Sequence, residues 1–514
     1  MRIIKSSLIY SAFTSISRVA GFIRDIIFAN YLGAGIIADV FYVAFRFPNT
    51  FRRIFSEGAF NSAFVPIYSK LLSEPDDSEA KKFAGSTLVL LIFITSLIVI
   101  IGEIFMPQIL KILAPGFSEN SEKFVMLISS SRIIFPFLTL VSVVSILSSI
   151  LNSHDKFALS AAMPIILNIA LSLSVLTAAY SSENYLMYMS WGVIISGFIQ
   201  IFFLIISIRK NKILIQISKD YFSKPLTKFY KLFFPSMLSS GILQINIFIG
   251  TLIATYEPGA VSYLYYADRI YQLPLALIGI AIGITLLPNI SKQIKISSKY
   301  EVNNMIEKTI IYSLLLAIPA SVALFILPEL IIKILFERGA FDQYSTYASG
   351  LALKFFSLGL IAFILTKILT PIYFAFEDPK PPLRFAIITV LINASLSIYL
   401  FNKFGFLGIA IATSISAWIN VILLYINLRS KNYFLHSNKL LIPLGIIILS
   451  SFVLLVYLYY IQNFYLIYKF SNFYYEALFF LLIIFSAFVL YFLTIGLYKP
   501  FSYVNLKKKL FLNE

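Results

Sequence analysis

The sequence predicts an all-α integral membrane protein, and three observations support this class. Of the 514 residues, 59% are hydrophobic and only 13% are charged, with a mean hydropathy of +0.87. Apolar blocks of about 20 residues recur along the whole chain, which is the length that a helix needs to cross a roughly 30 Å hydrocarbon layer. Basic residues gather in alternate connections between these blocks, as the positive-inside rule predicts.

Fourteen membrane-spanning helices are expected from the apolar blocks. The predicted spans are approximately 6–29, 36–66, 84–113, 127–151, 158–180, 186–208, 231–255, 263–290, 309–336, 349–375, 384–401, 407–428, 440–461 and 474–498. The second span contains Pro48, where we expect a kink or a break because proline removes a helical hydrogen bond.

The distribution of basic residues predicts the orientation of the chain. Most Lys and Arg residues between the spans lie in one set of connections. The opposite set holds only Lys123, Arg338, Lys403 and Lys469. We therefore expect both termini on the cytoplasmic side of the membrane, as an even number of spans requires.

Several classes of function are excluded by composition. Cysteine is absent and the only histidines are His154 and His436, so thiolate chemistry and a histidine metal cluster are not expected. No Walker or Rossmann pattern occurs, which argues against a built-in ATPase. The net charge of +17 reflects the cytoplasmic connections, so we expect no nucleic-acid partner.

An internal repeat divides the chain. FVPIYSK from residue 64 resembles LLPNISK from residue 286, PQILKIL from Pro107 resembles PELIIKIL from Pro328, and LNIALSL resembles INASLSI. Each pair is separated by about 220 residues, which indicates a duplication. The period contains an even number of spans, so the repeat is parallel, with a binding site expected between the halves. The predicted division is an N-lobe of six spans (1–225), a C-lobe of six spans (226–435) and two appended spans with a basic tail (436–514).

Charged residues inside the first, second and eighth spans are the candidate functional residues. Each charge near a helix centre costs about 2.5–3.5 kcal/mol on insertion scales, so such residues persist where they face protein or a water-filled cavity. The candidates for binding substrate are Arg18, Arg24, Asp25, Asp39, Arg52 and Arg269, and the secondary or gating candidates are Arg46, Arg53, Glu57 and Asp268.

Two interpretations of these charges stay open. They are satisfied pairs that fix helix packing or side chains that snorkel to the membrane interface, or they line a cationic cavity in a transporter. Arginine exceeds carboxylate in the first two spans, and its planar fork suits a diphosphate. Other charges within the predicted spans are interpreted mostly as interface residues: Glu103, Lys111, Arg132, Glu329, Lys333, Lys354 and Lys367.

Three runs carry a resemblance to a known family: SRVAGFIRDIIFANYLGAGIIADVFYVAFRFPNTFRRIFSEGAFNSAFVP at 17–66, LAPGF at 113–117 and YYADRIYQLP at 265–274. They resemble the MurJ (MviN) family of lipid II flippases, within the multidrug/oligosaccharidyl-lipid/polysaccharide (MOP) exporter superfamily. The resemblance implies a MATE-like fold of two six-helix lobes plus two C-terminal helices that form a groove for the lipid tail. It also implies a bacterial inner-membrane transporter that moves lipid II to the periplasmic leaflet for peptidoglycan synthesis.

The resemblance implies roles for particular residues. Arg18, Arg24, Asp39 and Arg52 match essential cavity positions, and Arg269 matches the arginine of the eighth span. Arg24, Asp25 and Arg269 are the positions expected nearest the pyrophosphate and the first sugar.

One departure from the family concerns the driving ion. Some members are thought to hold sodium with carboxylates on the seventh, eleventh and twelfth spans. Here these spans (231–255, 384–401 and 407–428) contain no Asp or Glu, only hydroxyls and amides such as Asn246 and Asn393. A hard cation prefers charged oxygen ligands. We therefore expect no sodium site of that type and no cofactor, with membrane potential or a proton driving the cycle.

Two other classes of function were weighed. An exporter of another polyprenyl-linked glycan fits the cationic spans, whereas an exporter of cationic drugs requires the opposite charge in its cavity. A membrane enzyme would need a carboxylate cluster for magnesium or a histidine nucleophile, and the connections offer neither. The partners that the flippase interpretation implies are lipid II, membrane lipids and proteins of cell-wall synthesis or division.

Overall fold

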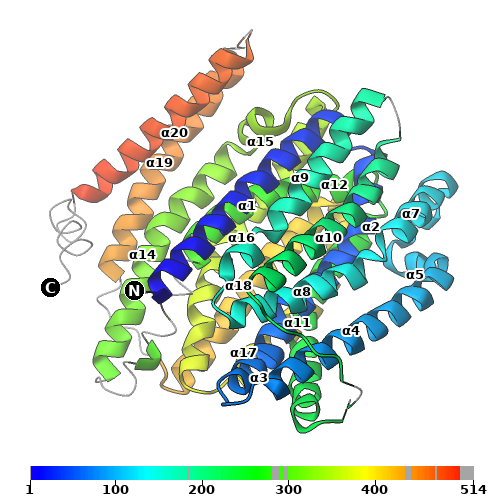
Figure 1. Ribbon diagram of the computed structural model, residues 1–514. Coiled ribbons are helices and arrows are strands. Elements are labelled where there is room, and N and C mark those ends of the chain that lie inside the picture. The colour runs from blue at the N-terminus through cyan, green and yellow to red at the C-terminus, as the bar shows by residue number, and fades with distance from the viewer. Residues whose placement is uncertain are drawn as a thin grey trace. The chain divides into compact units, whose positions relative to one another are not determined.

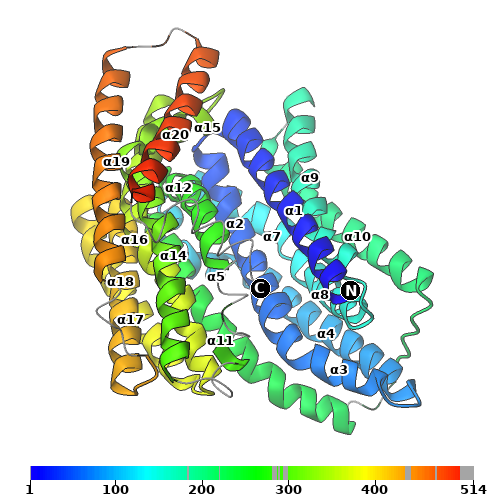
Figure 2. The same ribbon diagram turned by 90° about the vertical axis from the view of Figure 1, so that its left-hand side faces the viewer.

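The computed structural model describes residues 2–181, 184–218, 220, 222–280, 286, 290–292, 299–434, 441–468, 470 and 472–497 (Figures 1 and 2). Every regular element in these residues is helical, which confirms the all-α class. The chain forms two compact units. Unit 1 comprises Met1–Ser262 and Arg338–Asp342, and unit 2 comprises Tyr263–Glu337 and Gln343–Glu514.

Unit 1 contains eleven α-helices and one π-helix among its described residues, and the start of a twelfth α-helix. They are α1 (Arg2–Leu32), α2 (Ile36–Arg52), η1 (Arg53–Phe64), α3 (Val65–Leu72), α4 (Ser78–Ile104), α5 (Met106–Leu113), α6 (Pro115–Ser118), α7 (Ser121–Ile134), α8 (Phe137–Ser153), α9 (Phe157–Ser181), α10 (Tyr185–Lys210), α11 (Lys224–Ala254) and the first residues of α12 (Ala260–Pro274). Helix α1 packs along α9, which packs in turn against α10 (Figure 1).

The second predicted span is irregular, but not at its proline. Helix α2 continues through Pro48, and the departure from α-helical geometry begins at Arg53, where η1 starts. The widened turns of a π-helix shift the spacing of side chains along this stretch.

Two predicted spans end earlier than expected because each helix stops before a proline. The span predicted at 84–113 separates into α4 and the short helix α5, with Pro107 in the first turn of α5. The span predicted at 309–336 separates in the same way into α14 (Lys299–Ile326) and α15 (Pro328–Phe336), with Pro328 in the first turn. A proline lacks the N–H that would continue the preceding helix and suits the start of the next. The breaks thus occur at equivalent points of the sequence repeat.

Unit 2 holds the remaining described helices. They are the rest of α12, η2 (Leu275–Ile280), α14, α15, α16 (Gln343–Ala375), α17 (Lys380–Phe404), α18 (Leu407–Ser430), α19 (Leu441–Ile467) and α20 (Phe473–Gly496). Helix α18 packs against both α16 and α17. The appended pair α19 and α20 lies side by side (Figure 2) and shares an apolar core with α14 and α15. In that core the hydroxyl of Tyr491 donates to the carbonyl of Leu315 at 2.7 Å.

A polar cluster also joins the appended hairpin to α15. Lys333 of α15 donates to Glu476 of α20 at 2.5 Å and to the hydroxyl of Tyr465 of α19 at 2.9 Å, and Tyr465 also donates to Glu476. Glu476 is buried. Burial alone would lower the pKa of Lys333, but hydrogen bonds with Glu476 and Tyr465 reverse this effect, so its pKa lies above the ordinary value. We call Lys333, Tyr465 and Glu476 the hairpin clamp.

We predict that E476Q loosens the hairpin without unfolding unit 2. The substitution removes the negative charge of the acceptor and so weakens hydrogen bonds that are worth about 1.5–3 kcal/mol each when a charged group takes part, and amide hydrogen exchange in α20 should quicken by tenfold or more while exchange in α16 is unchanged. K333M should have the same effect, and K111M, at the equivalent lysine of α5, should have none. Equal exchange in E476Q and the unsubstituted protein would contradict the clamp.

Because folding raises the pKa of Lys333, the stability that its protonated form contributes is fully present below the ordinary lysine pKa and is lost only as pH rises through the raised value. Exchange corrected for its intrinsic pH dependence should therefore not change between about pH 6 and pH 9 through this lysine.

Ten of the described helices are long and apolar enough to cross a membrane. They confirm a multi-pass membrane protein. The total of fourteen spans stays a prediction, as does the division into lobes at residues 225 and 435, because the two compact units divide the chain differently.

Candidate functional site

A buried ion pair lies in the C-terminal third of α1. Arg24 donates from Nε and Nη2 to one carboxylate oxygen of Asp25, at 3.1 and 2.6 Å, and from Nη1 to the side-chain oxygen of Asn168 on α9 at 2.9 Å. Arg24 is 6% exposed and Asp25 is 1% exposed. The carboxylate and the amide together fix the plane of the guanidinium.

The close contact of α1 with α9 makes this arrangement possible. A Cβ at Gly21 would lie 3.3 Å from the amide nitrogen of Asn168, so glycine leaves room for that side chain. The same nitrogen donates to the carbonyl of Ser17 at 3.1 Å. Asn168 therefore holds α9 to α1 and orients Arg24 at the same time.

Asp39 of α2 forms a second buried cluster. The Asp39 carboxylate is fully buried and accepts four hydrogen bonds: from Nζ of Lys123 at 3.0 Å, from the backbone nitrogens of Gly259 and Ser262 at 2.9 and 3.0 Å, and from the hydroxyl of Ser262 at 2.7 Å. The backbone donors belong to the start of α12, whose unpaired N–H groups and positive dipole end favour a carboxylate. These contacts give Asp39 a structural role, and its role in substrate binding stays a prediction.

Lys123 was not predicted as a site residue. The sequence places it among the few basic residues of the outward connections, yet it is 6% exposed, and its Nζ lies 3.9 Å from the ring centroid of Phe117. The spacing of residues gives no signal for this contact. The sequence shows only that Asp39 lies in the second span and that Lys123 is one of the few basic residues in the outward connections. Their pairing depends on the tertiary fold.

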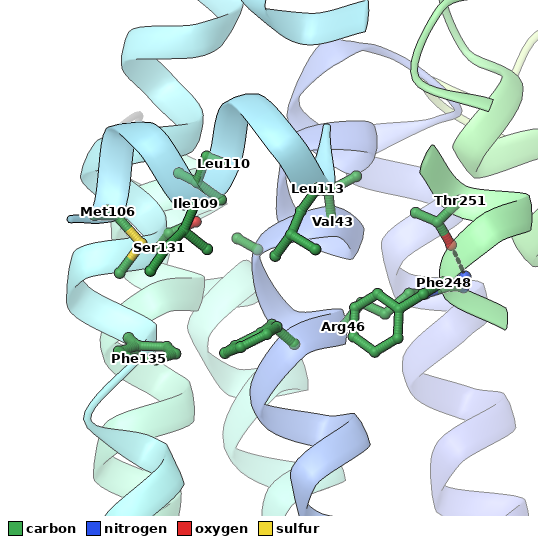
Figure 3. A pocket seen from close by; sticks show the side chains of 12 residues that line it. Val43, Arg46, Met106, Ile109, Leu110, Leu113, Ser131, Phe135, Phe248 and Thr251 are labelled. Atoms are coloured by element: carbon green, nitrogen blue, oxygen red, sulfur yellow. Dashed lines mark hydrogen bonds between the residues drawn. The ribbon is translucent and has the colours of Figure 1, made fainter. Parts of the chain in front are cut away.

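Arg46 borders a small cavity between α2, α5, α7 and α11 (Figure 3). Its guanidinium donates to the hydroxyl of Thr251 and to the carbonyl of Ile247 at 3.3 Å. The cavity has a volume of about 20 Å³ and is otherwise lined mostly by apolar side chains such as Phe135 and Phe248. A water molecule occupies about this much space, so the cavity is far too small for a diphosphate.

The other candidates in unit 1 lie on α1, at the end of α2 or in η1. Arg18 is exposed on α1, and Arg52, at the end of α2, is half-buried and donates to the side-chain oxygen of Asn49 at 3.0 Å. Arg53 begins η1 and is half-buried. Glu57 lies outside the residues whose side chains the structure describes.

The two candidates of unit 2 lie side by side in sequence on α12. The guanidinium of Arg269 donates to the hydroxyl of Tyr265 at 2.7 Å and lies over its ring, at 4.8 Å from the centroid. Asp268 accepts from the side chain of Gln272. Both are half-buried.

The structure thus separates the predicted residues of unit 1 into distinct polar clusters. Arg24 and Asp25 come together with Asn168, whereas Asp39 and Arg46 each lie in a cluster of their own. Within the described residues, no group of three His, Asp or Glu side chains is placed to hold a metal ion. Orientation of guanidinium groups in a membrane protein suits the binding of an anion more than any covalent chemistry.

Comparisons with known proteins agree with this interpretation. The model of the lipid II flippase MurJ family matches residues 28–493. A "Probable lipid II flippase MurJ" of Rhizobium tropici is 37% identical over 458 residues, which cover 88% of this chain and 86% of that protein. The protein of the same name from Rickettsia prowazekii (strain Madrid E) is 36% identical over 481 residues, covering 92% and 93% of the two chains.

Solved structures give the same result. A structure described as "Lipid II flippase MurJ, inward closed conformation" matches with a TM-score of 0.81 and 28% identity, over 97% of this chain and 99% of that chain. An inward-facing MATE transporter of the MOP superfamily matches with a TM-score of 0.68 and 14% identity, over 82% and 97%, which supports the MATE-like fold alone. This chain therefore belongs to the lipid II flippase MurJ family.

Proposed function

We propose that this protein is a lipid II flippase, which carries the undecaprenyl-pyrophosphate-linked peptidoglycan precursor from the cytoplasmic to the periplasmic leaflet by alternating access. The observation that carries the proposal is the match of almost the whole chain to a solved lipid II flippase, at a TM-score of 0.81. The family is one of transporters, so the protein is not a catalytic enzyme. Its role in peptidoglycan synthesis and its place in the bacterial inner membrane follow from the substrate.

Arginines are the residues proposed to hold the diphosphate. Arg24 is the best-defined member, since Asp25 and Asn168 fix its orientation within unit 1. Arg18, Arg52 and Arg269 are proposed to add charge to the same substrate. A diphosphate offers several acceptor oxygens, which suits forked donors better than single ammonium groups.

Reconstitution tests this function directly. Proteoliposomes holding the full chain and lipid II should move lipid II between leaflets, as measured with a reagent that reaches only the outer leaflet. In cells without a second flippase, depletion should leave lipid II in the cytoplasmic leaflet. Normal periplasmic delivery after depletion would overturn the proposal. Faster transport of a different polyprenyl-linked glycan would favour an exporter of that glycan instead.

Membrane potential is the proposed driving force, with a proton as the alternative. Moving one elementary charge across the membrane is worth about 2.3 kcal/mol per 100 mV. With the cytoplasm negative, the potential assists both the outward passage of a diphosphate and the inward return of cationic residues. Helices α11, α17 and α18 contain no Asp or Glu, which does not favour a sodium site there.

We therefore predict that transport stops when the membrane potential is collapsed and continues when sodium is replaced by choline. At a potential of about 100 mV, a net movement of one charge changes the equilibrium about 50-fold. The measurement is the lipid II transport assay with and without an ionophore for potassium. Transport that requires sodium at constant potential would contradict the prediction.

Both termini are proposed to face the cytoplasm, and proteins of cell-wall synthesis or division are proposed as partners. The chain contains no cysteine, so single cysteines can be introduced one at a time without background. A cysteine beside Lys431 should react only with reagents that enter the cell, whereas one beside Lys403 should react with an impermeant reagent. The reverse pattern would exclude the orientation.

A further inference from the structure

An open groove lies on the surface of unit 1, and none of the residues in the clusters described above line it. It is formed by α4, α7, α8 and α10 and has a volume of about 610 Å³, which is within the usual range for small-ligand sites. Its walls are mainly apolar, and its lining includes Val99, Ile100, Leu140, Ile194 and Phe198. The lining also includes the charged side chain of Arg132 on α7 and the amphipathic side chain of Trp191 on α10.

The polar part of the groove lies at the level where a membrane span ends. Glu103, which pairs with Arg132, is one residue from the C-terminal end of α4, directly after a long run without charges. Trp191 lies within the first two turns of α10 and is 48% exposed. Tryptophan at the end of a span marks the interface between hydrocarbon and headgroups. The groove therefore runs from the headgroup level into the hydrocarbon of one leaflet.

Arg132 and Glu103 form a loose pair of opposite charges. Nε of Arg132 is 4.0 Å from Oε2 of Glu103, beyond hydrogen-bond distance, and the two side chains are 51% and 31% exposed. The other carboxylate oxygen, Oε1, is buried and accepts no hydrogen bond from any described residue. A partly exposed carboxylate that Arg132 does not hydrogen-bond, next to a half-exposed guanidinium, suits a ligand that brings both a donor and an anion.

We propose that this groove binds phosphatidylethanolamine, with the lipid phosphate on Arg132, the primary ammonium on Glu103 and one acyl chain along the apolar wall. The headgroup carries an anion and a cation a few bonds apart, matching the two side chains in sign. A choline headgroup cannot donate a hydrogen bond to the Glu103 carboxylate. Phosphatidylglycerol has no ammonium, and its phosphate would lie close to the carboxylate. The groove therefore selects a headgroup and does not merely accept lipid.

Native mass spectrometry of the full-length protein tests the proposal. The protein would be released from nanodiscs of phosphatidylcholine that contain equal fractions of phosphatidylethanolamine and phosphatidylglycerol. The unsubstituted protein should retain phosphatidylethanolamine at least tenfold more often than either other lipid. R132Q should reduce this retention to background. E103Q should lose the preference and retain phosphatidylglycerol at least as well, because it keeps the phosphate contact.

Matched controls and a second type of variant keep the test decisive. R209Q, at the far end of α10, and E119Q, in the connection after α6, remove the same charges elsewhere and should retain lipid normally. S96W fills the groove without altering any charge and should also lose the lipid. This variant therefore tests the proposal even if R132Q does not fold. Equal retention of the three lipids, a preference for phosphatidylglycerol, or normal retention in R132Q, E103Q and S96W would each overturn the proposal.

Discussion

Replacing Asp39 with alanine is expected to lower the free energy of unfolding by about 3–5 kcal/mol, the cost of removing one partner of a buried ion pair. Lys123 would stay buried without its carboxylate, and the start of α12 would lose the acceptor of Gly259 and Ser262. The measurement is thermal or denaturant unfolding of the protein in detergent, followed by complementation of growth.

Two variants separate this cause from a general effect of mutation. K123M in the D39A background removes the stranded charge and should recover part of the lost stability. D378N removes an acidic partner from the more exposed pair of Asp378 with Lys431 and should change stability by only about 0–1 kcal/mol. If D39A unfolds at the temperature of the unsubstituted protein, the Asp39 cluster is not structural.

The double substitution R24Q/D25N is expected to fold and to lose transport. Removing Arg24 alone would take its ion-pair partner from the buried Asp25, so a single variant cannot distinguish stability from substrate binding. The double variant removes both charges and keeps polar side chains of similar size. If Arg24 holds the diphosphate, each lost charge-assisted hydrogen bond of about 1.5–3 kcal/mol reduces transport of lipid II by about tenfold or more.

The readouts for this variant are unfolding temperature and lipid II transport in proteoliposomes. R209Q is the matched control, because it removes an exposed arginine at the end of α10. A folded double variant that transports lipid II at the normal rate would show that Arg24 only stabilises the contact of α1 with α9, and the assignment of substrate binding to it would be wrong.

Local sequence patterns predicted the helical class well, because crossing hydrocarbon demands a long apolar run that is visible in one dimension. They did not place the ends of the helices. The apolar run continues from α4 through α5, and only Pro107 signals the break between them. The π-helical stretch from Arg53 was also missed, because the sequence pointed to Pro48 as the irregular position.

The site was only partly predictable for a related reason. Arg24 and Asp25 are neighbours in sequence, so their ion pair could be predicted, and both were candidate site residues. Their third partner, Asn168, is 144 residues away, and Lys123 is 84 residues from Asp39. Contacts of this kind are set by which helices pack together, and a neutral asparagine or an outward lysine carries no charge pattern that would reveal them.

The hairpin clamp has a consequence for how the appended helices are held. Lys333 occupies the same place in α15 as Lys111 does in α5, within the shared run Lys-Ile-Leu that follows each proline break. Lys111 is exposed, whereas Lys333 binds Glu476. Because both halves carry this lysine, the appended hairpin needs to supply only the acidic partner, Glu476, for the contact to form.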